Sequence, residues 1–195
     1  MTDCQFILAS QSPRRADLLG RYGLRFAVRP ADIDESRRPA ESPDDFVLRL
    51  AREKAAAVEG AGLPVLGADT VVVLEQDVLG KPRDRDDALD MLSRLSGRAH
   101  EVLTAACVRN AQRSETLLSR TEVQFATLSS AQIQAYWNSG ESAGKAGAYA
   151  IQGLAEAFVT EIRGSYSGVV GLPLQGSLGL LKLFGVEPPV WSVHE

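Results

Sequence analysis

The chain has 195 residues, enough for one sizeable domain and few for two. Its 21 Lys and Arg against 25 Asp and Glu give a formal net charge of −4, which argues against binding along a nucleic-acid backbone. Two cysteines, Cys4 and Cys107, and two histidines, His100 and His194, are too few for a disulfide scaffold or for a Cys- or His-built metal centre. The polar residues 1–3 and the lack of a long apolar run indicate neither a signal peptide nor a membrane span. We therefore expect a cytoplasmic protein with no nucleic-acid or membrane partner.

Strands and helices alternate through the first half of the chain. Apolar runs, Pro at helix starts and Gly at helix ends predict, in order, a strand over 5–9, a helix from 13 to about 20, a strand over 25–29, a helix over 43–58, a strand over 64–74 followed by a turn at 75–77, and a helix from 84 or 85 to 95.

The second half opens with a hairpin. The same signals predict, in order, long strands over 99–109 and 114–128, a short helix from 129 or 130 to 137, strands over 148–152 and 158–162, and a last helix over 173–184. Alternation followed by a hairpin predicts an α/β fold with a mixed sheet, in a single domain over residues 1–195.

Hydroxyl and guanidinium groups cluster where the first strand meets the first helix. Ser10 and Ser12 lie just before the helix, and Arg14 and Arg15 lie in its first turn. Free backbone N–H groups and the helix dipole favour an anion there, whereas an Arg at this end opposes the dipole. A bound phosphate would explain the two arginines. The alternative is that Ser12 is a plain helix cap and the arginines are solvated.

Two charged residues interrupt apolar patterns. Lys54 lies on the apolar stripe of the second helix, where a lysine either extends to solvent or meets an anion. Asp69 interrupts an apolar strand after Gly67, and such a carboxylate is neutralised, paired with a cation or placed on a metal. A structural salt bridge from Asp69 to a nearby Lys or Arg is the alternative to a functional role.

An acidic loop and a lysine on a stiff turn complete the candidate site. Glu35 lies in the run Asp-Glu-Ser at 34–36, and Lys81 lies in Gly-Lys-Pro at 80–82. If Glu35 faces Asp69 across a cleft, the two carboxylates would make an oxygen-rich site for Mg²⁺ or Mn²⁺. The alternative for Glu35 is an ordinary solvated turn.

A series of short motifs follows in a specific order along almost the whole chain. They are SQSPRR at 10–15, DES at 34–36, EKA at 53–55, GADT at 67–70, GKP at 80–82, LSGR at 95–98, HEV at 100–102, KAGAYAIQG at 145–153, GSYS at 164–167 and VGLPL at 170–174. Together these motifs resemble the Maf family of nucleoside triphosphate pyrophosphatases. Gly144 and Gly168 depart from the family pattern, which usually has an acid and an Asn there.

The resemblance implies an elongated α/β fold with two lobes around a central cleft, as in the inosine triphosphate pyrophosphatases. It implies hydrolysis of a nucleoside triphosphate to the monophosphate and pyrophosphate with a divalent metal, Mg²⁺ or Mn²⁺. Asp69 would accept the proton from the attacking water, and Asp69 and Glu35 would hold the metal. The residues that would hold the triphosphate are Ser10, Ser12, Arg15, Lys54 and Lys81. The family also implies a homodimer.

Three positions separate the branches of the family. Arg14, Thr70 and Gln152 resemble the branch that acts on dTTP and UTP rather than on 7-methyl-GTP. The amide of Gln152 can both donate to and accept from the edge of uracil or thymine. A modified pyrimidine nucleotide is an alternative substrate. A nucleotide-binding regulator of septum formation with incidental turnover is the alternative function, but such a protein would not need Asp69.

Overall fold

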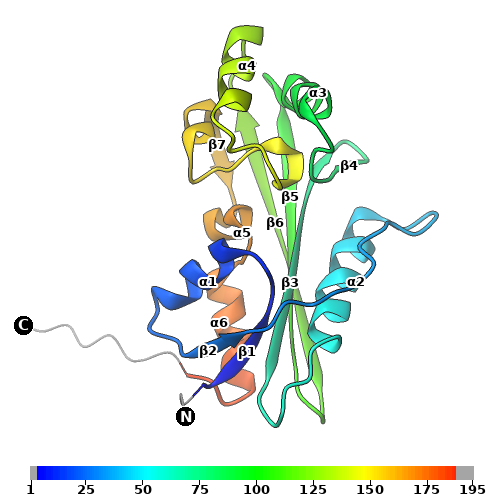
Figure 1. The fold of residues 1–195 in the computed structure, drawn as a ribbon, viewed down its shortest axis with the longest axis vertical. Helices are drawn as coiled ribbons and strands as arrows, with labels where there is room; N and C mark the ends of the chain where they lie inside the picture. The colour runs from blue at the N-terminus through cyan, green and yellow to red at the C-terminus, as the bar shows by residue number, and fades with distance from the viewer. Residues whose placement is uncertain (1–3, 188–195) are drawn as a thin grey trace, which may run out of the picture.

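The computed structural model describes residues 4–187, so residues 1–3 and His194 lie outside the described residues. One mixed sheet of seven strands runs through the molecule in the order β2-β1-β3-β5-β6-β7, with β4 paired to β3 (Figure 1). The β1–β2 and β1–β3 pairs are parallel, and the other pairs are antiparallel. The strands are β1 (Phe6–Ala9), β2 (Phe26–Val28), β3 (Val65–Leu74), β4 (Asp77–Leu79), β5 (Ala99–Arg109), β6 (Ser114–Phe125) and β7 (Val159–Arg163). The predicted α/β fold with a mixed sheet is confirmed.

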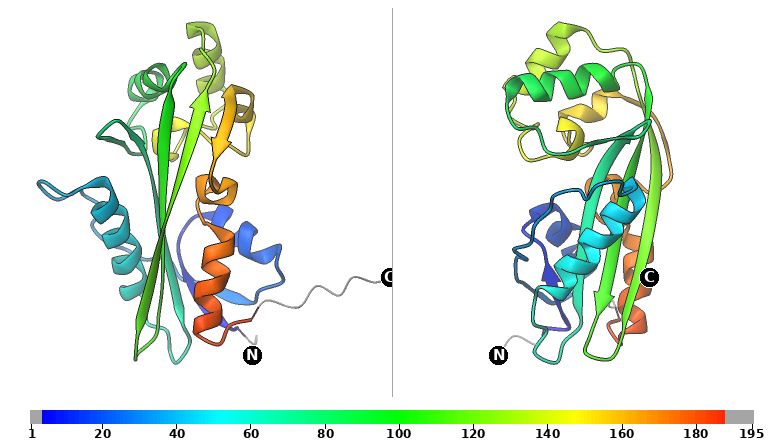
Figure 2. Two further views of the ribbon diagram at one scale, coloured as in Figure 1. Left: turned by 180° about the vertical axis from the view of Figure 1, so that it is seen from behind. Right: turned by 90° about the vertical axis from the view of Figure 1, so that its right-hand side faces the viewer.

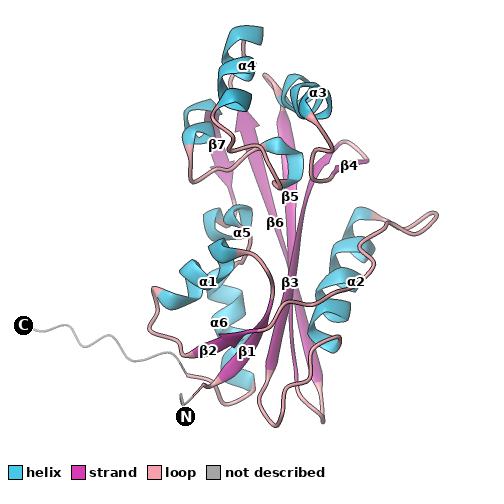
Figure 3. Ribbon diagram, viewed as in Figure 1, coloured by secondary structure: helices cyan, strands magenta, loops and turns pink. Residues whose placement is uncertain are grey.

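Helices flank this sheet (Figure 3). They are α1 (Pro13–Gly20), α2 (Pro43–Ala56), α3 (Arg85–Leu95), α4 (Ser130–Asn138), α5 (Tyr166–Val170) and α6 (Leu174–Leu183), with 3₁₀ turns η1 (Ala146–Ala148) and η2 (Leu154–Phe158). Side-chain caps fix four of the starts: Ser42 for α2, Asp84 for α3, Ser129 for α4 and Ser165 for α5 each accept from a backbone N–H three residues on. None of the helices within residues 4–187 is long and apolar enough to cross a membrane.

The molecule is elongated because β3, β5 and β6 are long and carry separate groups of elements along their length. The helices α1, α2 and α6 lie beside one half of these strands, and α3 and α4 lie beside the other half (Figure 2). Around the first half, α2 packs on one sheet face through Phe46, Val47 and Leu50, while α1 packs on the opposite face through Leu18 and Leu19. The expected elongated arrangement with two groups of elements is confirmed.

One edge of β3 is open in the middle of the strand. β1 pairs with residues 65–67 of β3, and β4 pairs with residues 72–74. The intervening residues 68–71 pair with β5 on the other side of β3. Among the described strands, none covers the β1–β4 side of residues 68–71. Because consecutive side chains of a strand point to opposite faces, Asp69 and Thr70 lie at this opening on opposite faces of the sheet.

The α2 helix lies unusually close to β3. A Cβ built on Gly67 would lie 2.5 Å from the backbone oxygen of Ala51 and 2.5 Å from the backbone nitrogen of Ala55. Both atoms belong to the helix backbone and cannot rotate away. Glycine at position 67 is therefore what allows α2 to pack at this distance, and α2 carries Lys54 to the strand that carries Asp69.

We expect Gly67→Ala to destabilise the protein by about 1–3 kcal/mol, since the added methyl group must push α2 away from β3. The control is Gly179→Ala, on the exposed face of α6, where a Cβ meets nothing within 4 Å. That change should be neutral or stabilising, because Ala favours a helix over Gly. Urea unfolding of the two variants measures the difference. Equal stabilities would contradict the close approach described here.

Two sequence predictions need correction, and one α-helix was not predicted. The strand predicted over 148–152 is wrong: this segment lies in turns, and Gly147 and Ala148 have φ values of 65° and 60°. Its apolar side chains are buried without forming a strand, and a buried irregular segment has the same apolar sequence as a buried strand. The predicted turn at 75–77 is shorter than expected, because β4 begins at Asp77. Helix α5 was not predicted.

Candidate functional site

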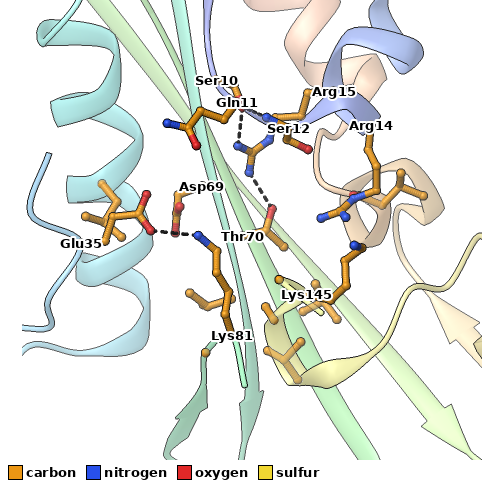
Figure 4. A pocket seen from close by; sticks show the side chains of 18 of the residues that line it. Ser10, Gln11, Ser12, Arg14, Arg15, Glu35, Asp69, Thr70, Lys81 and Lys145 are labelled. Atoms are coloured by element: carbon orange, nitrogen blue, oxygen red, sulfur yellow. Dashed lines mark hydrogen bonds and ion pairs between the residues drawn. The ribbon is translucent and has the colours of Figure 1, made fainter. Parts of the chain in front are cut away.

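A pocket of about 690 Å³ lies at the open edge of β3. The groups that line it come from the end of β1, the start of α1, the loop before α2, α2 itself, β3, and the turns around residues 80 and 143–152 (Figure 4). Five basic residues and three acidic residues line the pocket: Arg14, Arg15, Lys54, Lys81 and Lys145, with Asp32, Glu35 and Asp69. The pocket is thus locally basic, although the chain as a whole carries a net charge of −4.

Lys54 joins two carboxylates that are far apart in the sequence. Its Nζ lies 2.6 Å from Oδ1 of Asp69 and 2.7 Å from Oε1 of Glu35. The side chains of Lys54 and Asp69 are each only 10% exposed. The alternative in which Lys54 extends into solvent is therefore wrong, and Asp69 makes the ion pair with a lysine that its structural alternative described. A buried pair of this kind is costly to break from one side.

Glu35 also faces Lys81. The Nζ of Lys81 lies 3.3 Å from Oε2 of Glu35 and is well exposed. Burial raises the pKa of Glu35, but Lys54 and Lys81 outweigh it, and the pKa lies below its ordinary value of 4.5. Glu35 therefore carries its negative charge through the neutral range, as a cation ligand must.

The carboxylate pair fits a divalent cation. Glu35 and Asp69 already converge on one positive group, the Lys54 ammonium. Mg²⁺ is commonly held by one or two carboxylates together with substrate phosphates. No group of three or more His, Cys, Asp or Glu side chains is gathered for a metal within residues 4–187. The donor set therefore suits a cation that arrives with a phosphate ligand rather than a cation fully enclosed by protein groups.

On the other face of β3, Arg15 is held by three acceptors. Its Nε donates to the Gly171 oxygen at 2.8 Å, its Nη1 to Ser10 Oγ at 3.0 Å, and its Nη2 to Thr70 Oγ1 at 3.3 Å. Arg15 is 8% exposed, so the alternative in which it is solvated is wrong. Burial lowers the pKa of Arg15, while Asp69 opposes this shift.

Thr70 is held in turn by Thr104. The Thr104 hydroxyl donates to the Gly168 oxygen at 2.7 Å. Since that proton is committed, Thr70 donates to Thr104 Oγ1 at 2.9 Å and keeps a lone pair for Arg15. This chain of hydrogen bonds fixes the Arg15 guanidinium at the open edge. Thr104 was not predicted as a site residue. Its signal is a single hydroxyl within the apolar run of β5.

Ser10 and Ser12 lie in the pocket wall as predicted, but Ser12 does not cap α1. Its side chain makes no capping hydrogen bond, and its backbone N–H donates to Ser10 Oγ at 3.1 Å. The alternative of a plain helix cap is therefore wrong. Arg14 donates from Nε to the Val170 oxygen at 3.1 Å, which directs it along the same wall as Arg15.

Arg14 and Lys145 bring two positive charges together. Burial lowers the pKa of Lys145, and the charge of Arg14 lowers it further, although Glu141 opposes the shift. Burial likewise lowers the pKa of Arg14. Two partly buried cations at one end of a pocket are a usual sign of an anion site. Lys145 follows Gly144, which has a φ of 66° that favours glycine.

The remaining wall is the segment 145–153, which carries Gln152. Two buried tyrosines fix this segment to the second group of elements. Tyr149 Oη lies 2.8 Å from Nε2 of His100, and Tyr136 Oη accepts from the Ala150 N–H at 3.0 Å. Gly147 donates from its N–H to the Gly80 oxygen at 3.1 Å and lies against Val72. Gln152 lines the pocket from this fixed segment, and its side chain is exposed.

His100 should make stability depend on pH. Burial lowers its pKa from 6.5 to about 4, so the folded protein binds this proton less readily than the unfolded chain. The associated stability is complete above pH 6.5 and is lost as the pH falls towards 4. We expect a loss of about 2 kcal/mol between pH 7 and pH 5. His100→Gln, which does not titrate, should flatten this slope in urea unfolding. An unchanged slope in the variant would contradict the assignment.

Known proteins resemble the chain over nearly its full length. The family model described as Maf-like protein matches residues 5–184. A dTTP/UTP pyrophosphatase of Anaeromyxobacter dehalogenans is 56% identical over 189 residues, which cover 95% of this chain and 96% of that protein. A dTTP/UTP pyrophosphatase of Hahella chejuensis is 51% identical over 193 residues, which cover 96% and 95%. The solved structure of the Staphylococcus aureus Ham1 protein is 10% identical, with a TM-score of 0.43 over 62% of this chain and 71% of that one.

Proposed function

The chain belongs to the Maf family, and from that premise we propose that it is an enzyme that hydrolyses nucleoside triphosphates, dTTP and UTP above all, to the monophosphate and pyrophosphate. The observation that carries the proposal is the convergence of Asp69 and Glu35 on Lys54, in a pocket that also holds four further basic side chains. The relatives named dTTP/UTP pyrophosphatase support the substrate. A single domain, a homodimer and a cytoplasmic location stay predictions.

The reaction needs a nucleophile on one side of the α-phosphorus and stabilised charge on the other. Water forms the new P–O bond and loses a proton, while the bond from the α-phosphorus to the bridging oxygen breaks and pyrophosphate leaves. In this proposal Asp69 accepts the proton. A divalent cation bound at Glu35 and Asp69, Mg²⁺ or Mn²⁺, would neutralise phosphate charge and lower the pKa of bound water.

The basic side chains stabilise the phosphates from both faces of β3. Lys54 and Lys81 lie on the side of Asp69 and Glu35, whereas Arg15 is fixed beside Thr70. Ser10 and Ser12 add their hydroxyl groups at the same wall. Charges fixed before the reaction are effective because they need not reorganise as negative charge moves to the leaving pyrophosphate.

We expect Asp69→Asn to lower kcat at least about 10²-fold, because the amide keeps the volume but neither accepts the proton nor carries charge. Asp77→Asn is the control, since Asp77 is exposed on β4 and pairs with Arg94 outside the pocket. Pyrophosphate release from a panel of nucleoside triphosphates with Mg²⁺ or Mn²⁺ measures both variants. Near-normal turnover by a folded Asp69→Asn protein would reduce Asp69 to a structural ion pair.

The base would be read by the segment 145–153. We propose that the Gln152 amide pairs with the edge of uracil or thymine, since it can donate to O4 and accept from N3–H. Its exposed side chain lines the pocket from a segment fixed by Tyr149 and Tyr136. Arg14 and Thr70 would affect the same choice of base, because both belong to the pocket wall that holds Arg15.

We expect Gln152→Ala to narrow the kcat/KM preference for dTTP and UTP over ATP, GTP and 7-methyl-GTP by about 1–3 kcal/mol, the usual cost of an unpaired polar group. Gln175→Ala, on the exposed face of α6, is the matched control. Steady-state kinetics on the five nucleotides measure the change. An equal loss on every base would make Gln152 a scaffold residue, and a wild-type preference for 7-methyl-GTP would place the chain in the other branch of the family.

A further inference from the structure

Glu35 lies on a segment that has no helix or strand to hold it. Residues 29–42 connect β2 to α2 without regular structure. The turn around Glu35 is closed locally, because Asp34 accepts from the Ser36 N–H and from the Ser36 hydroxyl, each at 2.9 Å. These contacts lie within the turn itself. They do not determine where the turn sits relative to Asp69.

A guanidinium on α2 connects this turn to the helix. Nη2 of Arg49 donates to the backbone oxygen of Ser36 at 2.9 Å, directly after Glu35 in the chain. The same group binds both carboxylate oxygens of Glu41, at 2.6 Å and 2.9 Å, and Glu53 at 3.0 Å. It thus ties the turn, the end of the loop and the helix together at one point.

This guanidinium is placed more like a core group than a surface one. The side chains of Arg49 and Glu41 are 13% and 8% exposed, and the guanidinium lies 5.5 Å from the ring centre of Phe46. Contact with Arg49 lowers the pKa of Glu41 to about 2, so the pair stays ionised at neutral pH. The planar guanidinium of Arg can donate to several fixed acceptors at once, whereas the ammonium group of Lys cannot do so in the same geometry.

Helix α2 also carries Lys54, whose ammonium group contacts Glu35. Arg49 and Lys54 are five residues apart on α2; Lys54 faces the sheet, and Arg49 faces the loop. A shift of the loop would separate Glu35 from Lys54 and Asp69 and leave the fold of the sheet intact. Helix α2 therefore contacts the Glu35 turn from both flanks: Lys54 meets the Glu35 carboxylate and Arg49 holds the backbone after it, while Arg38 pairs with Glu53 and Ile33 packs on the apolar cluster of the helix.

We propose that Arg49, with Glu41 as its partner, is a positioning residue that places Glu35 opposite Asp69 and so completes the cation site. The inference rests on the proposed function in one respect, namely the role given to Glu35. Arg49 itself is not among the residues that line the pocket, so its effect on the site is indirect.

The test compares Arg49→Met, Arg49→Lys and Glu35→Gln with the control Arg52→Met, whose side chain lies exposed on α2 and meets Thr116 rather than the loop. Three quantities are measured for each folded variant: Mn²⁺ binding without nucleotide, the Mn²⁺ concentration for half-maximal pyrophosphate release, and the rate of trypsin cleavage after Arg37 in the loop. The last measurement needs neither metal nor turnover.

We expect Arg49→Met to weaken Mn²⁺ binding and raise the half-maximal concentration at least tenfold, to change kcat at saturating Mn²⁺ less than threefold, and to speed cleavage after Arg37 at least tenfold. Arg49→Lys should show smaller changes in the same direction. Glu35→Gln should share the metal defect but leave cleavage slow, and Arg52→Met should match the wild type.

Unchanged cleavage and Mn²⁺ binding in folded Arg49→Lys or Arg49→Met would overturn the proposal. So would a fall in kcat with an unchanged Mn²⁺ dependence. If the wild-type protein hydrolyses none of the nucleotides, the proposed function fails, while cleavage after Arg37 and direct Mn²⁺ binding still decide whether Arg49 positions Glu35.

Discussion

The site depends on one property of the sheet: β3 has an open edge where β1 has ended and β4 has not begun. A strand paired on both edges exposes its side chains on two separate faces. Here a ligand at residues 68–71 can contact both faces at once, so that Asp69 on one face and Thr70 on the other belong to a single pocket. Asp69, Glu35, Lys54 and Lys81 approach from one face, and Arg15 approaches from the other.

The buried charges Lys54 and Asp69 are stable because they are paired with each other on one face of β3. Lys54 would be expensive to bury alone, as would Asp69, but their contact at 2.6 Å offsets part of that cost. Gly67 makes the contact available by allowing α2 to approach β3. The same pairing matters for the proposed reaction, in which a cation bound at the oxygens of Asp69 and Glu35 would leave Lys54 able to contact a phosphate.

The sequence was informative wherever a residue violated its local pattern. Asp69 in an apolar strand, Lys54 on an apolar stripe and two arginines in the first turn of α1 all lie in the pocket. The sequence indicated that Asp69 could pair with a Lys or Arg and that Lys54 could meet an anion, but local patterns do not identify tertiary partners, so neither the Lys54–Asp69 pair nor the Thr104–Thr70–Arg15 chain could be named. The segment 148–152 was misassigned because burial on all sides of a turn mimics a buried strand, and positive φ at Ala148 leaves no trace in its composition.

Placing chemistry on two adjacent residues of one strand also constrains how the chain can change in length. Side chains alternate with a period of two, so an insertion or deletion of one residue between Gly67 and Asp69 would move the carboxylate to the Arg15 face and the hydroxyl to the Lys54 face. A change in the length of β3 would therefore exchange the two faces of the site, whereas a change in the length of a connection away from the opening, such as the polar turn between β5 and β6, would leave the side chains of β3 on their faces.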